Sequence, residues 1–415
     1  MAAPARNTLA IIGAGPIGLE AAAAALDHGF DVHVFERGEV GAHPLGWGHV
    51  RMFTPWRMNL GPHATARLQA AGWTAPDPDA CPTGLELAER ALQPLARLPE
   101  LEGRVHTHAQ VVHVGRRGAL KGDLPGSPER REHPFRLLVR DPGGRESFLH
   151  AFSLIDASGV YGQPNWAGDG GIPARGEIYL APQLAYRLED VLGLSRARYA
   201  GRRTLVIGGG ASAATTVTAL AKLATESPGT SVVWAMRGSP ATLAAGLEDD
   251  PLPERRALIA AARLLAQGAD PSVAAIGGAV VEGFEFNSAT HRYRVNLLAG
   301  GQPRNEEVDE VVVHTGFGPD NAITRELQVH ECYATRAPMK LAAALLGAAA
   351  GDCLSTPAFG ADVLANPEPD FFILGHKSYG RSPNFLLETG FKQVADVIAT
   401  LAPAAGLEPA LRPAP

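Results

Sequence analysis

The sequence predicts an α/β protein in which one glycine-rich strand–turn–helix unit is inserted into a domain formed around another. An apolar run at residues 8–12 is followed by glycines at G-x-G-x-x-G spacing, and a run at 204–207 is followed by a similar group. Two more apolar runs, 152–155 and 371–374, end in small-residue or polar turns, which is typical of parallel strands at a ligand site. A chain of 415 residues has room for two or three domains.

The first unit has the features of a dinucleotide-binding turn. Gly13 permits the tight turn, Gly15 lets a pyrophosphate touch the backbone, and Gly18 lets the following alanine-rich helix pack close to the strand. The N-terminus of that helix offers free N–H groups and the positive end of its dipole to the phosphates. A second strand ends at Glu36, whose carboxylate can accept hydrogen bonds from both ribose hydroxyls. We therefore expect this unit to prefer a ribose without a 2′-phosphate.

The second unit repeats this geometry, but a different type of residue follows its second strand. Gly208 and Gly210 follow the strand at 204–207, and Ala213 takes the place of the third glycine. The next strand leads into Arg237, where the first unit has an acid. A guanidinium pairs with a 2′-phosphate that a carboxylate would repel, so NADPH is favoured over NADH. The alternatives are that Arg237 caps a helix or faces solvent.

The order of these units predicts where the inserted domain begins and ends. Asp156 and the turn through Gly159 lead into a stretch dense in glycine and proline, which marks a crossing between domains. Strands at 280–286 and 291–298 complete the inserted domain, and a strand at 308–313 precedes the return. The predicted domain segments are 1–165, 166–315 and 316–415, of which the first and third form one domain.

A loop at residues 43–64 is unusual for its aromatic and basic content. Such side chains can stack on a planar ring or donate hydrogen bonds to its carbonyl groups. The residues concerned are Trp47, His49, Arg51, Trp56, Arg57 and Asn59. The alternative is a loop at a domain interface with buried tryptophans.

Composition argues against several classes of function. With 46% hydrophobic residues, 19% charged residues and a net charge of −6, the chain has no basic character that would attract nucleic acid or an anionic membrane. The first apolar run is already the nucleotide-binding strand, which argues against a signal peptide, and the apolar stretch 341–350 is too short to span a bilayer. We expect a cytoplasmic protein without nucleic-acid or membrane partners.

Cysteine and histidine patterns favour neither a redox pair nor a metal site. Cys81, Cys332 and Cys353 are far apart and no C-x-x-C is present, so a redox-active cysteine pair and a paired-cysteine zinc site are both disfavoured. A predicted strand at 105–114 places His106 and His108 on one face, but no third ligand can be named. We expect no metal.

One dinucleotide-binding unit interrupted by another resembles the two-dinucleotide-binding-domain flavoproteins, here in a bacterial branch without a redox-active cysteine pair. That superfamily includes glutathione-reductase-like enzymes and the flavin-containing and Baeyer–Villiger monooxygenases. The resemblance implies an FAD-binding Rossmann-like domain with an inserted second NAD(P)-binding Rossmann-like domain, with FAD and NADPH as cofactors. The segment 378–387, S-Y-G-R-x-P-x-F-L-L, resembles bacterial flavoproteins labelled monooxygenase or thioredoxin-reductase-like.

The resemblance also implies which residues contact the cofactors. Those expected to bind FAD are Gly13, Gly15, Gly18, Glu36, Arg37, Trp47, Val111, Asp156, Gly159, Gly375, His376 and Gly390, and those expected to bind NADPH are Gly208, Gly210, Ser212 and Arg237. Gly375 occupies the position of the C-terminal FAD motif, and His376 stands where reductases usually have an aspartate for the ribityl chain. The helix that starts before Gly390 would stabilise negative charge on the reduced flavin. Lys377 and Arg381 precede it, as flavin-edge residues or as solvated charges.

The resemblance implies an FAD-dependent, NADPH-oxidising oxidoreductase. G-G-G-A-S-A at 208–213 resembles the NADPH motif of monooxygenases, so we expect a monooxygenase-like enzyme that oxygenates a small nitrogen- or sulfur-containing substrate through a flavin C4a-hydroperoxide. Arg51, Asn59 and Lys377 are the expected catalytic residues.

Two alternatives stay open because the F-x-G-x-x-x-H stretch of monooxygenases is absent before the second unit. One is an NAD(P)H-dependent reductase of a quinone or small disulfide without protein redox cysteines. The other is a flavin-binding redox sensor with little turnover. The expected partners are a small-molecule substrate and oxygen, and a homodimer is one option for the oligomeric state.

Overall fold

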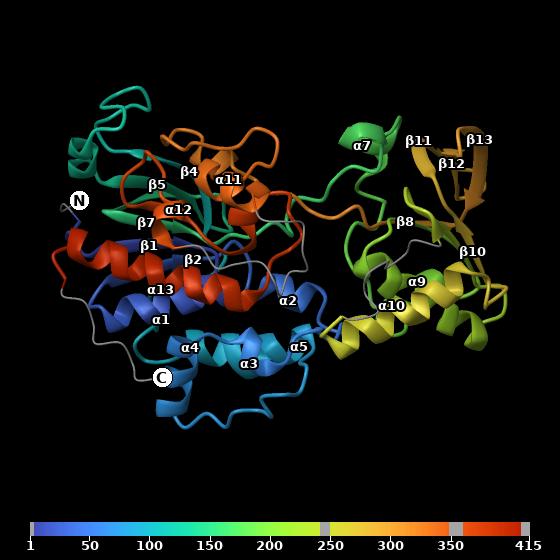
Figure 1. The fold of residues 1–415 in the computed structure, drawn as a ribbon, viewed down its shortest axis with the longest axis horizontal. Helices are drawn as coiled ribbons and strands as arrows, with labels where there is room; N and C mark the ends of the chain where they lie inside the picture. Colours follow the sequence, from blue (N-terminus) through green and yellow to red (C-terminus); the bar gives the residue numbers. More distant parts are fainter. Residues whose placement is uncertain (1–3, 241–249, 348–359, 408–415) are drawn as a thin grey trace. The chain divides into compact units, whose positions relative to one another are not determined.

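The computed structural model describes residues 4–240, 250–347 and 360–407, which form two compact units (Figure 1). The first unit contains the described residues within Met1–Gly48, Pro55–Gln163 and Gly318–Pro415. The second contains His49–Thr54 and those within Pro164–Phe317. The chain therefore leaves the first unit twice, once for a short segment and once for a long one. None of the helices in the described residues has the length and apolar character needed to span a bilayer.

The first unit is built on a five-stranded parallel sheet in the order β15-β7-β1-β2-β3. Its strands are β1 (Thr8–Ile12), β2 (Asp31–Phe35), β3 (Val105–His106), β7 (Ser153–Asp156) and β15 (Phe371–Ile373). Every residue of the central strand β1 is buried, as expected for a parallel strand covered on both faces. The predicted strands at 8–12, 152–155 and 371–374 are thus confirmed to within a residue.

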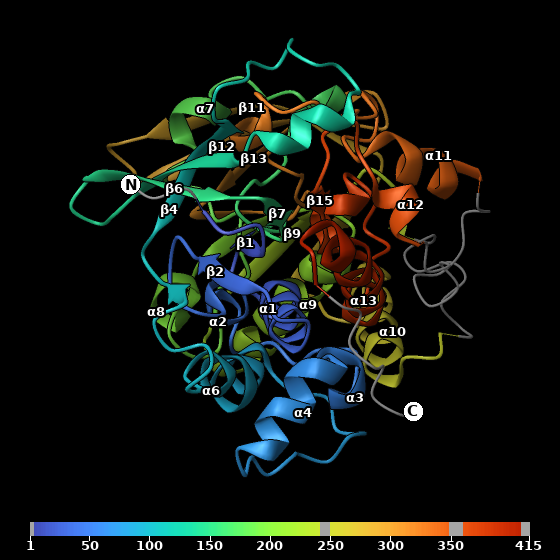
Figure 2. The same ribbon diagram turned by 90° about the vertical axis from the view of Figure 1, so that its left-hand side faces the viewer.

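Helices cover one face of this sheet and a second, antiparallel sheet covers the other. Helix α1 (Pro16–Asp27) and helix α13 (Leu387–Ala404) pack side by side on the first face (Figure 1). The antiparallel sheet consists of β4 (Gln110–Arg116), β5 (Phe135–Arg140) and β6 (Glu146–Ala151). In Figure 2, β1 and β2 lie between the two helices and the strands β4 and β6. Alternate residues of β1, Ala10 and Ile12, pack against apolar side chains of β4 and β5.

The predicted single strand at 105–114 is wrong. The chain leaves the parallel sheet after β3 and enters the antiparallel sheet at β4, with a turn between them in which His108 has a φ of 52°. The two histidines therefore do not share a strand face. The His106 ring stacks on Phe35 with a centroid distance of 4.9 Å, whereas His108 Nε2 lies 2.7 Å from the carboxylate of Glu39.

Short helices occupy the connections of the first unit. Before the antiparallel sheet these are α2 (Ala42–Gly46), α3 (Trp56–Asn59), α4 (Pro62–Ala70), α5 (Gly84–Leu87), the π-helix η1 (Ala88–Leu92) and α6 (Gln93–Ala96). The later ones are η2 (Pro128–Glu132), η5 (Ala322–Thr324), α11 (Met339–Gly347), α12 (Ala361–Leu364) and η7 (Gly375–Tyr379). Cys353 lies outside the described residues.

The second unit repeats the same architecture. Its parallel sheet, in the order β10-β9-β8-β14, contains β8 (Arg203–Ile207), β9 (Ser231–Ala235), β10 (Val273–Ile276) and β14 (Glu310–Val313). Helices α9 (Ala211–Glu226) and α10 (Pro253–Ala266) pack on one face. An antiparallel sheet of β11 (Ala279–Asn287), β12 (Arg292–Ala299) and β13 (Gln302–Val308) packs on the other. The short helices are η3 (Asp169–Gly171), α7 (Glu177–Leu180) and α8 (Arg196–Tyr199).

Candidate cofactor-binding site

The first glycine turn joins β1 to α1 and leaves an open space at one position. Gly13 has a φ of +102°, and a Cβ built there would lie 2.7 Å from the carbonyl oxygen of Ala157. A Cβ on Gly18 would lie 1.9 Å from the carbonyl oxygen of Gly13. The fold itself therefore requires these two glycines. By contrast, apart from the adjoining residues of the chain, no described atom lies within 4 Å of a Cβ built on Gly15, which leaves room for a ligand against the backbone.

The N-terminus of α1 faces this space without a capping side chain. Gly15 is the N-cap residue and has no side chain to accept hydrogen bonds from the first turn, and Pro16 follows at the first helical position. The first N–H groups of a helix have no acceptor within the helix. A pyrophosphate placed over Gly15 would satisfy them and interact with the positive end of the helix dipole.

Glu36 is held in a fixed orientation at the end of β2. Its Oε2 accepts a hydrogen bond from the backbone N–H of Ala14 at 2.9 Å, and its Oε1 accepts one from Gly38 N–H at 2.8 Å. A carboxylate has about four acceptor sites, so both oxygens can still accept from ribose hydroxyls. The residue predicted to bind ribose therefore also braces the glycine turn.

A cavity in the first unit lies over the carboxyl ends of these strands, where open α/β sheets bind ligands. The predicted cofactor-binding residues that line it are Gly13, Gly15, Glu36, Arg37, Val111, Gly159, Gly375 and His376. Lining residues that the sequence did not single out as site residues include His43, Ser158, Gln163, Asp320 and Phe385. Ser158 lies in the small-residue turn after β7, and this turn, which is visible in the sequence, could have been used to predict it.

Four other residues predicted to bind FAD do not line the cavity. Gly18 and Gly390 allow close packing instead: a Cβ on Gly390 would lie 2.4 Å from Cδ1 of Ile17 in α1. The Trp47 ring packs against Gly84, where a Cβ would lie 2.5 Å from Cε3 of the ring. Asp156 is buried behind the turn that follows β7.

The three residues predicted to be catalytic do not line the cavity either. Arg51 belongs to the segment His49–Thr54 of the second unit. Asn59 is buried, and its Nδ2 donates to the carbonyl oxygen of Pro55 at 3.0 Å. Lys377 is 1% exposed, because the η7 turn places its side chain on the buried side.

Lys377 and Asp156 form a buried ion pair behind the cavity wall. Lys377 Nζ lies 2.6 Å from Asp156 Oδ2 and 3.1 Å from Ser158 Oγ. Asp156 Oδ1 accepts the Ser158 hydroxyl at 2.7 Å and the Ser158 backbone N–H at 3.1 Å. The pair thus connects the turn after β7 with η7, and both elements contribute residues to the cavity.

His376 presents a neutral ring at the cavity. Burial lowers the pKa of His376, although a hydrogen bond to Ser382 opposes the shift. Because a carbonyl oxygen only accepts, the 3.3 Å contact from Nε2 to the Ser382 oxygen assigns the ring proton to Nε2. The ring stacks on Phe385 with an interplanar angle of 9°.

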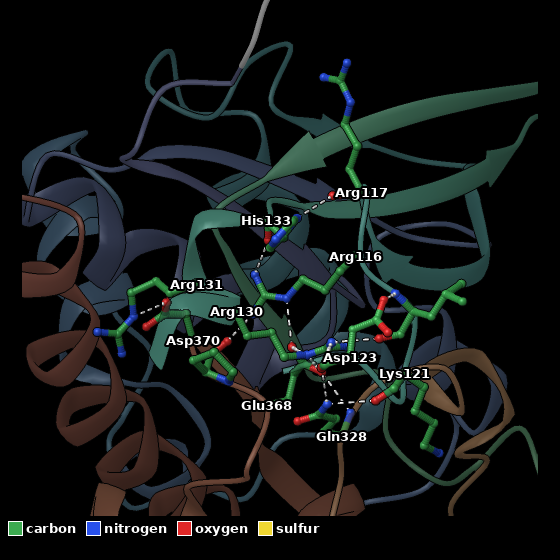
Figure 3. A network of polar contacts seen from close by, with 12 residues as sticks. Arg116, Arg117, Lys121, Asp123, Arg130, Arg131, His133, Gln328, Glu368 and Asp370 are labelled. Carbon is green, nitrogen blue, oxygen red and sulfur yellow. Dashed lines mark hydrogen bonds and ion pairs between the residues drawn. The ribbon is translucent and has the colours of Figure 1, made fainter. Parts of the chain in front are cut away.

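A buried ionic network anchors the antiparallel sheet whose strand β4 carries Val111. Both oxygens of the Glu368 carboxylate accept from Arg130 Nε, at 2.9 and 3.0 Å, and one also accepts from Arg116 Nε at 2.8 Å (Figure 3). All three side chains are fully buried. Burial lowers the pKa of Arg116, and Glu368 opposes that shift. This network links β4 to η2 and to the segment before β15.

The second unit contains an equivalent glycine turn. A Cβ on Gly208, which has a φ of +133°, would lie 2.2 Å from the carbonyl oxygen of His314, so the fold requires that glycine. Gly210 is the N-cap of α9 without a side-chain cap, and no described atom lies within 4 Å of a Cβ built there. Ser212 lies in the first turn of α9, and Arg237 is exposed just after β9. Burial lowers the pKa of His314 to about 4, so its ring is neutral beside this turn.

Within the described residues, no three histidine, cysteine, aspartate or glutamate side chains are arranged to hold a metal ion. Within the same residues, Cys81 and Cys332 form no disulfide.

Comparisons with known proteins identify the fold. Residues 8–41 match the family model described as pyridine nucleotide-disulphide oxidoreductase, and no curated protein matches the sequence. The structure is similar to bacillithiol disulfide reductase Bdr from Bacillus cereus, with a TM-score of 0.68 and 20% identity, covering 95% of this chain and 98% of that chain. The chain has the two-dinucleotide-binding-domain flavoprotein fold.

Solved structures of an N-hydroxylase and of a monooxygenase share this fold. Ornithine N-hydroxylase from Kutzneria sp. 744 has a TM-score of 0.61 and 16% identity, covering 96% of this chain and 99% of that chain. DfoA, the cadaverine monooxygenase of Erwinia amylovora, has a TM-score of 0.63 and 14% identity, covering 97% of this chain and 95% of that chain. The predicted fold class is confirmed. The open space at Gly15 and the uncapped N-terminus of α1 fit the pyrophosphate of FAD.

Proposed function

We propose that this protein is an FAD-dependent, NADPH-oxidising oxidoreductase in which the first unit binds FAD and the second binds NADPH. The observation that carries the proposal is the presence of two glycine turns with the same open position, at Gly15 and at Gly210. The two units differ in the residue that follows the second strand, where the ribose would bind: the first has the carboxylate of Glu36 and the second has the guanidinium of Arg237. Two sites with different ribose chemistry support two different dinucleotides.

The residues of the first unit would bind and orient FAD. The N–H groups at the start of α1 would bind its pyrophosphate, and Glu36 would accept hydrogen bonds from its ribose hydroxyls. In the second unit, Gly210 and Ser212 would lie at the pyrophosphate of NADPH and Arg237 at its 2′-phosphate. When bound, FAD would supply the redox chemistry, which is to accept a hydride and to pass the two electrons to a second substrate.

The finer proposal is a monooxygenase-like enzyme that uses oxygen and a small nitrogen- or sulfur-containing substrate. The similarity to an ornithine N-hydroxylase and to a cadaverine monooxygenase supports an amine. Arg51 stays a proposed catalytic residue on chemical grounds, since a guanidinium can donate hydrogen bonds to a polarised oxygen species. In that role, Arg51→Ala would raise the peroxide released per NADPH oxidised, whereas unchanged coupling with an identified substrate would contradict it.

A second candidate is an NADPH-dependent reductase of a small disulfide. The similarity to bacillithiol disulfide reductase favours it. The sequence has no C-x-x-C motif that could form a redox-active cysteine pair. Electrons would then pass to the small disulfide without a cysteine pair of the protein. A quinone would be reduced by the same direct route.

One experiment separates these candidates. NADPH consumption by the FAD-loaded protein is measured with and without oxygen, in the presence of a diamine, a low-molecular-weight disulfide or a quinone. Hydroxylated amine formed only with oxygen would support the monooxygenase, whereas thiol or quinol formed without oxygen would support the reductase. Full FAD loading with negligible NADPH consumption in every mixture would contradict both and favour the redox sensor.

A further inference from the structure

We propose that Lys377 is a positioning residue that acts through Ser158, so that Ser158 presents a hydrogen-bond acceptor to a hydroxyl or N–H group of the bound cofactor. The proposal rests on the proposed FAD site of the first unit. It replaces a direct catalytic role for Lys377, whose ammonium group is buried away from the cavity.

The direction of the Ser158 hydroxyl follows from its two charged partners. The ammonium of Lys377 can only donate, so Ser158 Oγ accepts its N–H at 3.1 Å. The carboxylate of Asp156 can only accept, so the Ser158 hydroxyl proton is donated to it at 2.7 Å. The Ser158 backbone N–H is also donated to Asp156, at 3.1 Å. Both donors of Ser158 are thus used inside the protein.

What Ser158 can offer the cavity is a lone pair. Ser158 is half-buried and lines the cavity, whereas Lys377 and Asp156, which do not line it, are 1% and 0% exposed. An acceptor repels phosphate oxygens and attracts hydroxyl or N–H groups. Because the start of α1 offers donors for the phosphates, Ser158 is suited to the polyol chain or to a ring N–H of FAD.

The turn that carries Lys377 has a separate set of hydrogen bonds. Gln393 in α13 accepts the N–H of Gly375 at 2.9 Å and donates to Ser378 Oγ at 3.0 Å. Ser378 in turn donates to the Gly375 carbonyl at 2.8 Å. These contacts hold η7 without the ammonium group. Lys377 is therefore not the only support of η7, which makes a test by substitution informative.

A double-mutant cycle on FAD binding tests the proposal. Dissociation constants of the apo-protein for FAD and for ADP are measured by fluorescence and calorimetry in wild type, Ser158→Ala, Lys377→Met and the double variant. ADP is the internal control, because it contains the ribose and phosphates but no polyol or flavin ring. Losing one hydrogen bond of this kind weakens FAD binding by roughly tenfold. We expect that loss in each single variant, no further loss in the double variant, and ADP affinity within twofold of wild type.

The results that would overturn the proposal are distinct from failure of the proposed function. Additive losses in the double variant, or equal losses for FAD and ADP, would make Lys377 a general structural residue. If Lys377→Met does not fold, the Ser158→Ala effect is measured with and without the charge-neutral pair Lys377→Met and Asp156→Asn. The proposal predicts that the tenfold effect falls below threefold in that background, and an unchanged effect would contradict it. A wild-type protein that binds ADP but not FAD would instead refute the proposed FAD site.

Discussion

Replacing Gly15 with alanine separates what the fold requires from what a cofactor requires. The backbone of Gly15 has a φ of −83° and a ψ of −174°, which alanine adopts without strain, and a Cβ there meets no described atom within 4 Å. Alanine is a poor N-cap residue, which destabilises the folded protein by about 1 kcal/mol. It also restricts the unfolded chain, which stabilises the folded protein by about 0.4–1 kcal/mol. The two effects nearly cancel, so the free energy of unfolding should change by less than about 1 kcal/mol.

The same methyl group should interfere with a pyrophosphate that lies against the backbone. We expect the dissociation constant for FAD to rise at least tenfold, which is about 1.4 kcal/mol of binding free energy. Urea denaturation of the apo-protein and fluorescence titration with FAD measure the two quantities. Gly18→Ala is the matched control, because its Cβ would lie 1.9 Å from the carbonyl oxygen of Gly13 and should cost about 1–3 kcal/mol of stability. Unchanged FAD affinity in a folded Gly15→Ala protein would refute the reasoning.

Three further predictions concern stability, pH and nucleotide preference. Glu368→Gln leaves two fully buried arginines without their carboxylate and should lower the free energy of unfolding, measured by urea denaturation, by about 3–5 kcal/mol. The control Glu146→Gln, in a half-exposed pair, should lower it by less than about 1 kcal/mol, and equal losses in the two variants would contradict this prediction. Asp27 accepts a hydrogen bond from His63, and this contact raises the pKa of His63. Burial acts to raise the pKa of Asp27, but the contact with His63 lowers it, so the pair stabilises the folded state most between about pH 4 and 6.5. Its contribution should be lost as the pH rises through the folded pKa of His63 or falls through that of Asp27, and a His63→Gln variant with the same stability profile from pH 5 to 8.5 as wild type would argue against it. Arg237→Ala should raise the KM for NADPH roughly tenfold or more without changing that for NADH, and steady-state kinetics showing equal effects on both would rule out contact with the 2′-phosphate.

The sequence was sufficient for the strands and turns whose signals are local. The run of apolar residues before Gly13 and the acid at Glu36 lie within one unit of consecutive residues, so spacing alone predicts their geometry. The predicted strand at 105–114 failed because an apolar and polar alternation does not show where a chain changes from one sheet to another. The edge strand β13 was missed because most of its residues are polar and exposed.

Long-range contacts could not be derived from the sequence. Arg116 and Glu368 are 252 positions apart, and no sequence motif near either residue indicates that the two are in contact. The placement of Lys377 depends on η7, which begins at Gly375 and is followed by Gly380, with φ values of +72° and +62° that other residues rarely adopt. We predicted Lys377 to be a flavin-edge residue or a solvated charge, but the sequence does not show that its side chain turns toward Asp156.

The central claim is that one unit holds FAD and the other delivers hydride from NADPH. The most direct test is to mix FAD-loaded protein anaerobically with NADPH or NADH and to record flavin absorbance in a stopped-flow instrument. We predict that the protein retains FAD and that NADPH bleaches the flavin at least tenfold faster than NADH, because Arg237 rather than a carboxylate follows β9. A protein that retains no FAD, or a bound flavin that stays oxidised with both nucleotides, would contradict the claim.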